Sequence, residues 1–351
     1  MARLLPGLGM MKAWVLEEHA DMGKVSEPLR LHDLPVPEPG PEEILVRVAA
    51  CGICHTELDE IEGRAAPHLP VVPGHQVTGR VEKTGSEAGR FTRGARVGVA
   101  WIYSSCGRCG WCRSGRENIC PDFRATGMDA DGGYAEYMVV PEAYAYPLPP
   151  EFNDIEAAPL LCAGAIGYRS LKLAGLVNGG NLGLMGFGGS NHLVLKLARH
   201  LYPDSNMYVF ARDPAERAFA LELGACWSGT IGEAAPDRLQ AAIDTTPVWS
   251  PVLAALANLA PGGRLVINAI RKESGDREVL MELDYPRHLW REKEIKSVAN
   301  VCRADVADCL RLAAAAGIRP DVEVYPFGEV NRALVDLKTR RIRGAKVLRV
   351  G

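Results

Sequence analysis

Four cysteines stand with the spacing C-x2-C-x2-C-x7-C, at Cys106, Cys109, Cys112 and Cys120. Four thiolates so close in sequence can surround one zinc ion tetrahedrally, and the interleaved glycines let the loop curl. Such a site has no position for substrate. The alternatives are chance, an iron–sulfur cluster, which usually has another spacing, and a zinc ribbon that binds nucleic acid, which needs basic and aromatic surroundings. The spacing therefore predicts a structural zinc.

A second set of ligand types is dispersed along the chain, at Cys54, His75 and Cys162. Two sulfurs and one imidazole would leave the fourth position of a tetrahedral zinc for a reacting molecule, which is the arrangement of a catalytic site. An isolated cysteine or histidine is more often buried or solvated than bound to metal. Spacing alone therefore does not assign this second site.

A glycine-rich turn follows an apolar run and precedes a helix-like segment, with the pattern Gly186-x-Gly188-x-x-Asn191 and a further glycine at Gly189. Glycines there let backbone N–H groups and the start of a helix approach a pyrophosphate. Asn191 stands where the fingerprint usually has its last glycine. We predict a dinucleotide site at this turn; a purely structural turn is the alternative.

The elements that must position these residues change character along the chain. From 11 to about 150, short β-rich runs alternate with Gly and Pro, which predicts a compact, mostly β domain. From 182 to about 300, apolar strands alternate with helical patterns, which predicts an α/β domain with a doubly wound parallel sheet. The segment after 300 is too short for its own core, so we expect it to pack on the first domain.

Composition narrows the function classes. A chain of 351 residues with 47% hydrophobic and 24% charged residues fits two globular domains, and it has no apolar run of bilayer length. A net charge of −3 does not favour nucleic acid or membrane partners. Ten cysteines are too few for a disulfide scaffold and fit a reducing cytoplasm. Residues 1–10 are expected to be a flexible leader.

Taken together, these motifs resemble the zinc-containing alcohol dehydrogenases of the medium-chain dehydrogenase/reductase family. The similar stretches, from Met11 onward, are Cys51-Gly52-Ile53-Cys54-His55-Thr56, Gly74-His75, the four-cysteine lobe and Pro159-Leu160-Leu161-Cys162-Ala163-Gly164. The resemblance implies a GroES-like β-rich catalytic domain formed by 11–162 with 299–351, and a Rossmann cofactor domain at 163–298.

The resemblance also implies site roles and two zinc ions per chain. Cys54, His75 and Cys162 would bind the catalytic zinc, and Thr56 would take the proton from the alcohol. The remaining implied positions are His55 and Asp59 at the catalytic centre and Trp101 in the substrate pocket. Cys51, Cys226, Cys302 and Cys309 match no ligand position.

The chain departs from the family pattern close to these residues. Gln76 and Glu57 stand where members commonly have Glu and Asp, and Asp59 stands where some have a proton-relaying histidine. Gln76 cannot supply a negative charge near zinc. Asp59 would be a weak base near neutrality, since its ordinary pKa is about 3.9.

The end of the second Rossmann strand bears on the choice of cofactor. An acidic residue there binds the ribose of NAD, whereas this chain has Ala211 followed by Arg212, whose guanidinium could hold a 2′-phosphate. We therefore expect NADP(H) to be favoured over NAD(H), although Asp213 could take the ribose role if the alignment shifts.

The expected activity is reversible hydride transfer between a small primary or secondary alcohol, or its aldehyde or ketone, and a nicotinamide cofactor. By the resemblance, the chain should form a homo-oligomer, a dimer or tetramer. The alternatives are a polyol or amino-alcohol dehydrogenase on the same scaffold, and a zinc-stabilised protein without catalytic activity.

Overall fold

The computed structural model describes residues 9–339 and 343–351. The chain forms two units: Met1–Cys162 with Val301–Gly351, and Ala163–Asn300. The second boundary lies two residues beyond the predicted one. Most of the predicted leader lies outside the described residues, but Met10 already pairs with Pro35, so the first strand begins inside the segment predicted as leader.

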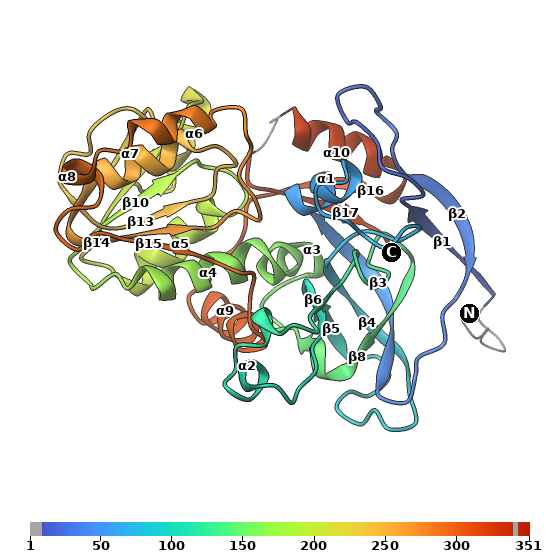
Figure 1. Ribbon diagram of the computed structural model, residues 1–351. Coiled ribbons are helices and arrows are strands. Elements are labelled where there is room, and N and C mark those ends of the chain that lie inside the picture. The colour runs from blue at the N-terminus through green and yellow to red at the C-terminus, as the bar shows by residue number, and fades with distance from the viewer. Residues whose placement is uncertain (1–8, 340–342) are drawn as a thin grey trace. The chain divides into compact units, whose positions relative to one another are not determined.

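The first unit is built on a seven-stranded sheet in the order β16-β17-β3-β4-β5-β9, with β8 also pairing with β3 (Figure 1). Its strands are β3 (Glu43–Ile53), β4 (Gln76–Thr84), β5 (Arg96–Val99), β8 (Tyr137–Pro141), β9 (Ala145–Pro147), β16 (Val322–Pro326) and β17 (Ala345–Arg349). Two small sheets pair β1 (Met10–Val15) with β2 (Arg30–Pro35), and β6 (Ile102–Ser104) with β7 (Arg124–Ala125).

Short helices connect these strands. They are α1 (His55–Ile61), α2 (Gly110–Arg113), α3 (Asp154–Ala157), α9 (Arg303–Ala315) and α10 (Val330–Lys338), with 3-10 turns η1 (Glu117–Ile119), η2 (Glu142–Tyr144), η3 (Ala158–Leu161) and η5 (Phe327–Glu329). Strand β17 pairs antiparallel with β3, so the C-terminal segment completes the sheet of the first unit.

The long strand β3 organises the core of this unit. Ile44, Leu45 and Val46 are fully buried because β3 has pairing partners on both sides, β4 and β8. Branched apolar residues fit this pleated, buried surface. Near its C-terminal end β3 pairs Gly52 with Gln76, so the residues just beyond the strand lie beside the start of β4.

The second unit is a six-stranded sheet in which every neighbouring pair is parallel. Its order is β12-β11-β10-β13-β14-β15, which is the 3-2-1-4-5-6 order of a Rossmann sheet. The strands are β10 (Asn181–Met185), β11 (Asn206–Phe210), β12 (Trp227–Gly229), β13 (Leu239–Asp244), β14 (Leu259–Ile267) and β15 (Glu294–Ser297). The strand order reverses between β10 and β13, where ligands bind in such sheets.

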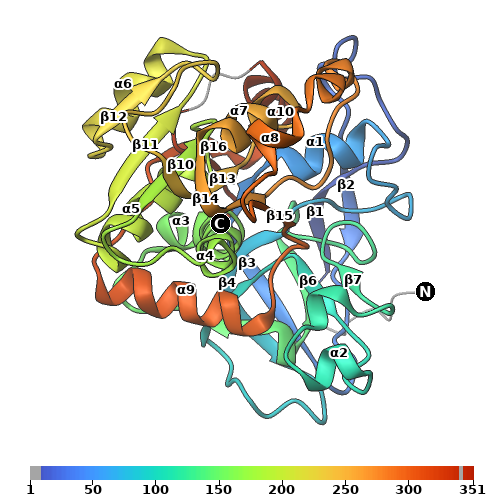
Figure 2. The same cartoon turned by 60° about the vertical axis from the view of Figure 1, so that its left-hand side comes forward.

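Helices cover both faces of this sheet. They are α4 (Ala163–Ala174), α5 (Asn191–Leu201), α6 (Pro214–Glu222), α7 (Ser250–Asn258) and α8 (Tyr285–His288), with the 3-10 turn η4 (Arg277–Glu282). Helices α4 and α7 both contact β13 and β14, and they lie on opposite sides of the sheet (Figures 1 and 2). Within residues 9–339 and 343–351, no helix is both long and apolar enough to cross a membrane.

Candidate active site and cofactor turn

The three dispersed ligand candidates lie together in the first unit. His75 Nε2 is 3.6 Å from Cys54 Sγ and 3.2 Å from Cys162 Sγ, and all three donor atoms lie within 4.8 Å of one another. Cys54 directly follows β3, His75 directly precedes β4, and Cys162 follows the buried turn η3. Pairing of β3 with β4 is therefore what joins the first two donors.

The donor set fits a zinc ion. With bonds of about 2.0 Å to nitrogen and 2.3 Å to sulfur, tetrahedral zinc ligands lie roughly 3.3 to 3.8 Å apart. The separations from His75 are close to this range. Without a cation, the hydrogen bond with Cys162, followed by burial, raises the pKa of the Cys54 thiol. A divalent cation reverses this effect because it stabilises the thiolate.

A buried carboxylate orients the imidazole. Glu57 Oε1 lies 2.6 Å from His75 Nδ1, and the two side chains are 0% and 1% exposed. Burial lowers the pKa of His75, but Glu57 and Cys54 raise it, and the net shift is well upward. With Nδ1 facing a carboxylate, Nε2 is the nitrogen available to a metal.

Helix geometry places Glu57 at this point. Cys54 is the N-cap of α1, and the Glu57 carboxylate accepts the Cys54 backbone N–H at 2.8 Å, which forms a capping box. One side chain thus contacts both the Cys54 segment and His75. The sequence marks Glu57 only as a departure from the family pattern, and its capping-box spacing after Cys54 is the signal that points to its position.

The other predicted catalytic residues differ in position. Thr56 Oγ1 lies 3.3 Å from Cys54 Sγ, so its hydroxyl is at the donor cluster, whereas His55 is exposed. Asp59 is buried and accepts a hydrogen bond from Arg64 Nε at 2.7 Å. That contact engages the Asp59 carboxylate with Arg64.

Trp101 lies against the same cluster. Its ring centroid is 6.4 Å from that of His75 in an edge arrangement and 5.5 Å from that of Phe123. The indole Nε1 is buried and has no hydrogen-bond partner among the described residues. The ring is therefore placed to limit the space beside His75.

A third carboxyl, besides those of Glu57 and Asp59, is buried on the same helix. Glu60 is 0% exposed, and neither of its oxygens has a hydrogen-bond partner among the described residues. Burial, followed by the nearby Glu57 carboxylate, raises the pKa of Glu60 well above its usual value. Of the Glu57 and Glu60 carboxyls, Glu57 is the one that has an ion-pair partner.

The four-cysteine lobe also converges. The sulfurs of Cys106, Cys109, Cys112 and Cys120 lie 3.5 to 3.9 Å apart in the four pairs that make contact. Tetrahedral zinc with sulfur bonds of about 2.3 Å needs sulfurs roughly 3.8 Å apart, whereas a disulfide needs about 2.0 Å. The lobe therefore fits a four-thiolate zinc.

Backbone amides add to the anionic character of this lobe. Hydrogen bonds from the N–H groups of Arg108 and Cys109 lower the pKa of Cys106 to about 6. Burial raises the pKa of Cys120 to about 11. The half-buried Cys106 is thus disposed to form thiolate at neutral pH.

The predicted cofactor turn lies at the strand-order reversal of the second unit. Gly186 has φ +77°, a conformation that favours glycine, and its N–H donates to Phe210 O at 2.7 Å. A side chain at Gly188 would meet no atom within 4 Å, so the backbone there is open to a ligand. Gly189 is half-buried in the same turn.

Residues after β11 supply positive charge. Arg212 is exposed, and Asp213 is the N-cap of α6, where it accepts the Ala215 N–H at 2.8 Å. Arg217 Nη1 donates to the carbonyl oxygens of Ala211 and Arg212, at 2.9 and 2.8 Å. A second guanidinium, which sequence reasoning missed, therefore lies at the end of β11.

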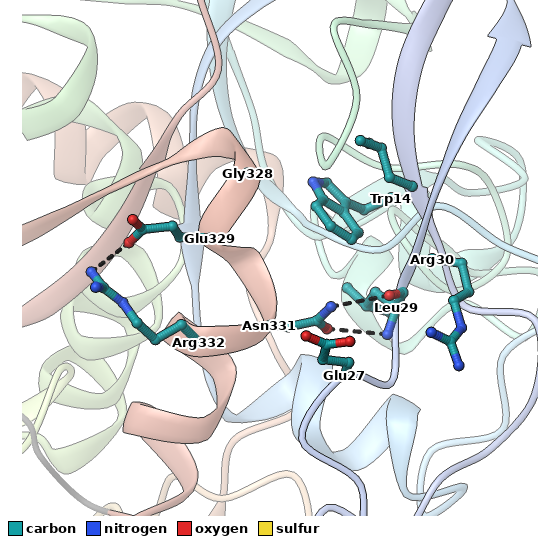
Figure 3. A pocket seen from close by; sticks show the side chains of 9 residues that line it. Trp14, Glu27, Leu29, Arg30, Gly328, Glu329, Asn331 and Arg332 are labelled. Carbon is teal, nitrogen blue, oxygen red and sulfur yellow. Dashed lines mark hydrogen bonds and ion pairs between the residues drawn. The ribbon is translucent and has the colours of Figure 1, made fainter.

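A separate cavity of about 350 Å³ lies in the first unit, between the β1–β2 hairpin and the start of α10 (Figure 3). It is lined by Trp14 and by the ion-paired Glu329 and Arg332. Asn331 closes one side through hydrogen bonds with the backbone of Leu29 (Figure 3). It contains none of the predicted site residues.

Comparisons with known proteins agree with this architecture. Residues 40–150 match the family model of the alcohol dehydrogenase GroES-like domain. The chain is 44% identical over 344 residues to the probable alcohol dehydrogenase AdhA of Mycobacterium tuberculosis, covering 96% of this chain and 97% of that one.

Two solved structures cover nearly the whole chain. A cobalt- and zinc-bound thermostable alcohol dehydrogenase from Pyrobaculum aerophilum is 26% identical, with a TM-score of 0.85 and coverage of 97% of this chain and 100% of that one. A putative zinc-binding dehydrogenase from Sinorhizobium meliloti bound to NADP is 25% identical, with a TM-score of 0.84 and the same coverage. This chain belongs to the zinc-containing alcohol dehydrogenases of the medium-chain dehydrogenase/reductase family.

Proposed function

We propose that the chain is a zinc-dependent dehydrogenase that interconverts small primary or secondary alcohols with aldehydes or ketones, using a nicotinamide cofactor. The observation that carries this proposal is the convergence of Cys54, His75 and Cys162 with the Thr56 hydroxyl beside them. Three protein donors leave one tetrahedral position for a substrate oxygen. When bound there, zinc supplies Lewis-acid chemistry, which polarises that oxygen and lowers the pKa of an alcohol.

The chain's own residues supply the rest of the chemistry. Cys54, His75 and Cys162 hold the metal, and Glu57 keeps the His75 ring in place through Nδ1. In the oxidative direction the Thr56 hydroxyl would accept the alcohol proton as it gives up its own to solvent, and in the reductive direction the two transfers would run in reverse. Trp101 restricts the pocket to small or slender substrates. Relay roles for His55 and Asp59 stay predictions.

The four-cysteine lobe would hold a second, structural zinc, so we propose two zinc ions per chain. The glycine turn at Gly186, Gly188 and Gly189 would bind the cofactor pyrophosphate. Arg212, supported by Arg217, would favour NADP(H) over NAD(H), because two guanidinium groups at the end of β11 suit a 2′-phosphate.

Zinc analysis and a substrate panel test the proposal together. Purified parent protein should contain two zinc ions per chain and should oxidise small alcohols with NADP or NAD. His75→Ala should stay folded, keep one zinc and lose alcohol oxidation, and Cys54→Ser should do the same. Full activity in zinc-analysed His75→Ala would overturn the catalytic assignment, and one zinc in the parent would favour a protein without catalytic activity.

We infer that the chain forms a homo-oligomer, a dimer or tetramer. Edge strand β15 pairs only with β14 among the described strands, and all four of its residues are exposed. One of them is the apolar Ile295, and further exposed apolar side chains precede the strand in sequence: Met281, Tyr285 and Trp290. An uncovered edge strand with apolar neighbours favours association. Light scattering of the parent and of Ile295→Lys measures the oligomeric state. A monomeric parent would contradict the inference.

A reducing cytoplasm is the compartment that we propose. None of the ten cysteines forms a disulfide, and six of them lie in the two donor clusters. An oxidising compartment would favour disulfides among such close thiols.

A further inference from the structure

Asn191 replaces the last glycine of the dinucleotide fingerprint and is the first residue of α5. It is fully buried. Its side-chain Nδ2 lies 2.7 Å from Gly186 O, 3.1 Å from Met185 O and 3.0 Å from Thr245 Oγ1. The amide therefore contacts the backbone of the very turn that we assign to the cofactor.

These acceptors come from two strand ends. Met185 ends β10 and pairs with Asp244, which ends β13, and Thr245 is the next residue. The strand order reverses between these two strands. One buried amide thus forms hydrogen bonds both with the glycine turn and with the residue that follows the neighbouring strand. These contacts lie at the strand-order reversal, where ligands bind in such sheets.

The polarity of the amide fits only one orientation. Nδ2 faces two carbonyl oxygens, while Oδ1 has no hydrogen-bond partner among the described residues. A flipped amide would place Oδ1 against those carbonyls. Burying an amide costs free energy unless it is hydrogen-bonded, so the side chain is retained here as a donor.

The glycines of the turn explain why hydrogen bonds from Asn191 are needed to hold its shape. Gly186 has a left-handed φ, and Gly188 has open space around its α-carbon. Glycine is the most flexible residue, so a turn rich in it loses entropy when it binds a ligand. The hydrogen bonds to Met185 O and Gly186 O hold the start of this turn before ligand arrives.

We propose that Asn191 is a positioning residue for the dinucleotide: it holds the Gly186–Gly188 turn in the shape that binds pyrophosphate. This inference rests on the proposed assignment of the turn as the cofactor site. The glycine fingerprint alone would suggest that Asn191→Gly, which restores the usual glycine, improves cofactor binding. The proposal leads to the opposite expectation: Asn191→Gly should weaken cofactor binding.

Calorimetric titration of the zinc-loaded protein with NADP and with NAD tests this. We expect Asn191→Gly and Asn191→Ala to raise both dissociation constants about 5- to 20-fold, the value of one or two net hydrogen bonds. Asn191→Ser, which keeps one donor, should fall between these variants and the parent. At saturating cofactor kcat should stay near the parent value, so the effect appears in the cofactor KM.

Asn258→Ala is the matched control. Asn258 is also buried in the second unit, donates from Nδ2 to Ala254 O at 2.9 Å and accepts the Ala235 N–H at 2.7 Å. Its loss should lower the melting temperature without changing either dissociation constant.

The outcomes separate the two proposals. A parent that fails to bind either dinucleotide contradicts the assigned cofactor turn. A parent that binds, with Asn191→Gly or Asn191→Ala binding equally well or better, overturns the role of Asn191. Equal weakening in Asn191→Ala and Asn258→Ala would also overturn it, because the effect would then be general destabilisation.

Discussion

The Glu57 carboxylate lies 2.6 Å from Nδ1 of His75, and both side chains are buried. The same carboxylate accepts the backbone N–H of Cys54. Although Gln76 cannot supply a charge beside the donor cluster, Glu57 supplies one from the adjoining helix. A carboxylate in this position fixes the imidazole and increases its basicity towards a metal.

Glu57→Gln should therefore reduce catalytic zinc affinity or activity by about 10- to 100-fold, the usual cost of losing such a partner. Glu57→Asp, which keeps a carboxylate, should retain more of both. Zinc content after dialysis and kcat/KM for a small alcohol give the measurements. Glu60→Gln is the matched control: it makes the same change on the same helix at a carboxyl that has no hydrogen-bond partner in the part of the chain that the structure describes. Equal losses in both variants would contradict the specific role of Glu57.

Thr56→Ala should lose activity by about 10²- to 10⁴-fold, the usual contribution of a positioned proton acceptor, while Thr56→Ser should keep much of it. The reason is that the Thr56 hydroxyl oxygen lies 3.3 Å from the Cys54 sulfur. Steady-state rates of zinc-loaded protein measure the difference. If the two variants behaved alike, Thr56 would have a packing role.

Arg212→Ala and Arg217→Ala should each lower kcat/KM for NADP about 10- to 100-fold more than for NAD, since a charge-assisted contact is worth about 1.5–3 kcal/mol. Arg217 contacts the end of β11 through two carbonyls, so its loss also frees that segment. Arg238→Ala is the control, because Arg238 likewise donates to a carbonyl, that of Ala257. A parent that prefers NAD, or an unchanged preference in Arg212→Ala, would refute the phosphate contact.

Cys109→Ser should remove one zinc per chain and destabilise the first unit by about 4 kcal/mol or more, in the range expected for loss of a metal site. The catalytic donors Cys54, His75 and Cys162 are separate from this lobe, so the folded fraction should still oxidise alcohols. Thermal unfolding and zinc content are the measurements. Cys226→Ser, at an exposed cysteine outside both clusters, should change neither. Unchanged zinc content in Cys109→Ser would contradict the structural site.

Stability of the second unit should fall as pH drops below about 6.5, the ordinary pKa of histidine. His288 is buried, and its Nδ1 accepts the Asp284 N–H at 2.9 Å. Burial, followed by the charge of Arg287, lowers the pKa of His288. The unfolded chain therefore binds the proton first, and each unit of lowering costs up to about 1.4 kcal/mol at pH below both pKa values.

His288→Asn, which keeps an acceptor but does not titrate, should flatten this dependence between pH 7.5 and 5. Urea unfolding of the parent and variant at several pH values gives the difference. His200→Asn, at an exposed histidine of α5, should leave the dependence as in the parent. If the unfolding free energy changed with pH equally in the parent and in His288→Asn, His288 would not be the cause of the pH dependence.

The sequence alone determined the features whose residues are local. The four cysteines from Cys106 to Cys120 are close enough in the chain that their spacing indicates convergence. The alternation of strands and helices after Leu182 likewise predicts a parallel sheet, since period and order are local properties. The short edge strands β12 and β15 did not stand out, because a strand of three or four residues carries too little pattern.

Tertiary structure decided the features that depend on distant partners. Cys54, His75 and Cys162 are brought together by the pairing of β3 with β4 and by η3, which no spacing encodes; family resemblance alone pointed to them. Glu57 reaches His75 only because the capping box turns it towards β4. The Asn191 side chain forms a hydrogen bond with Thr245, which follows a different strand of the sheet. In each case a short-range force, a hydrogen bond or an ion pair, acts between residues that only the folded sheets place within its reach.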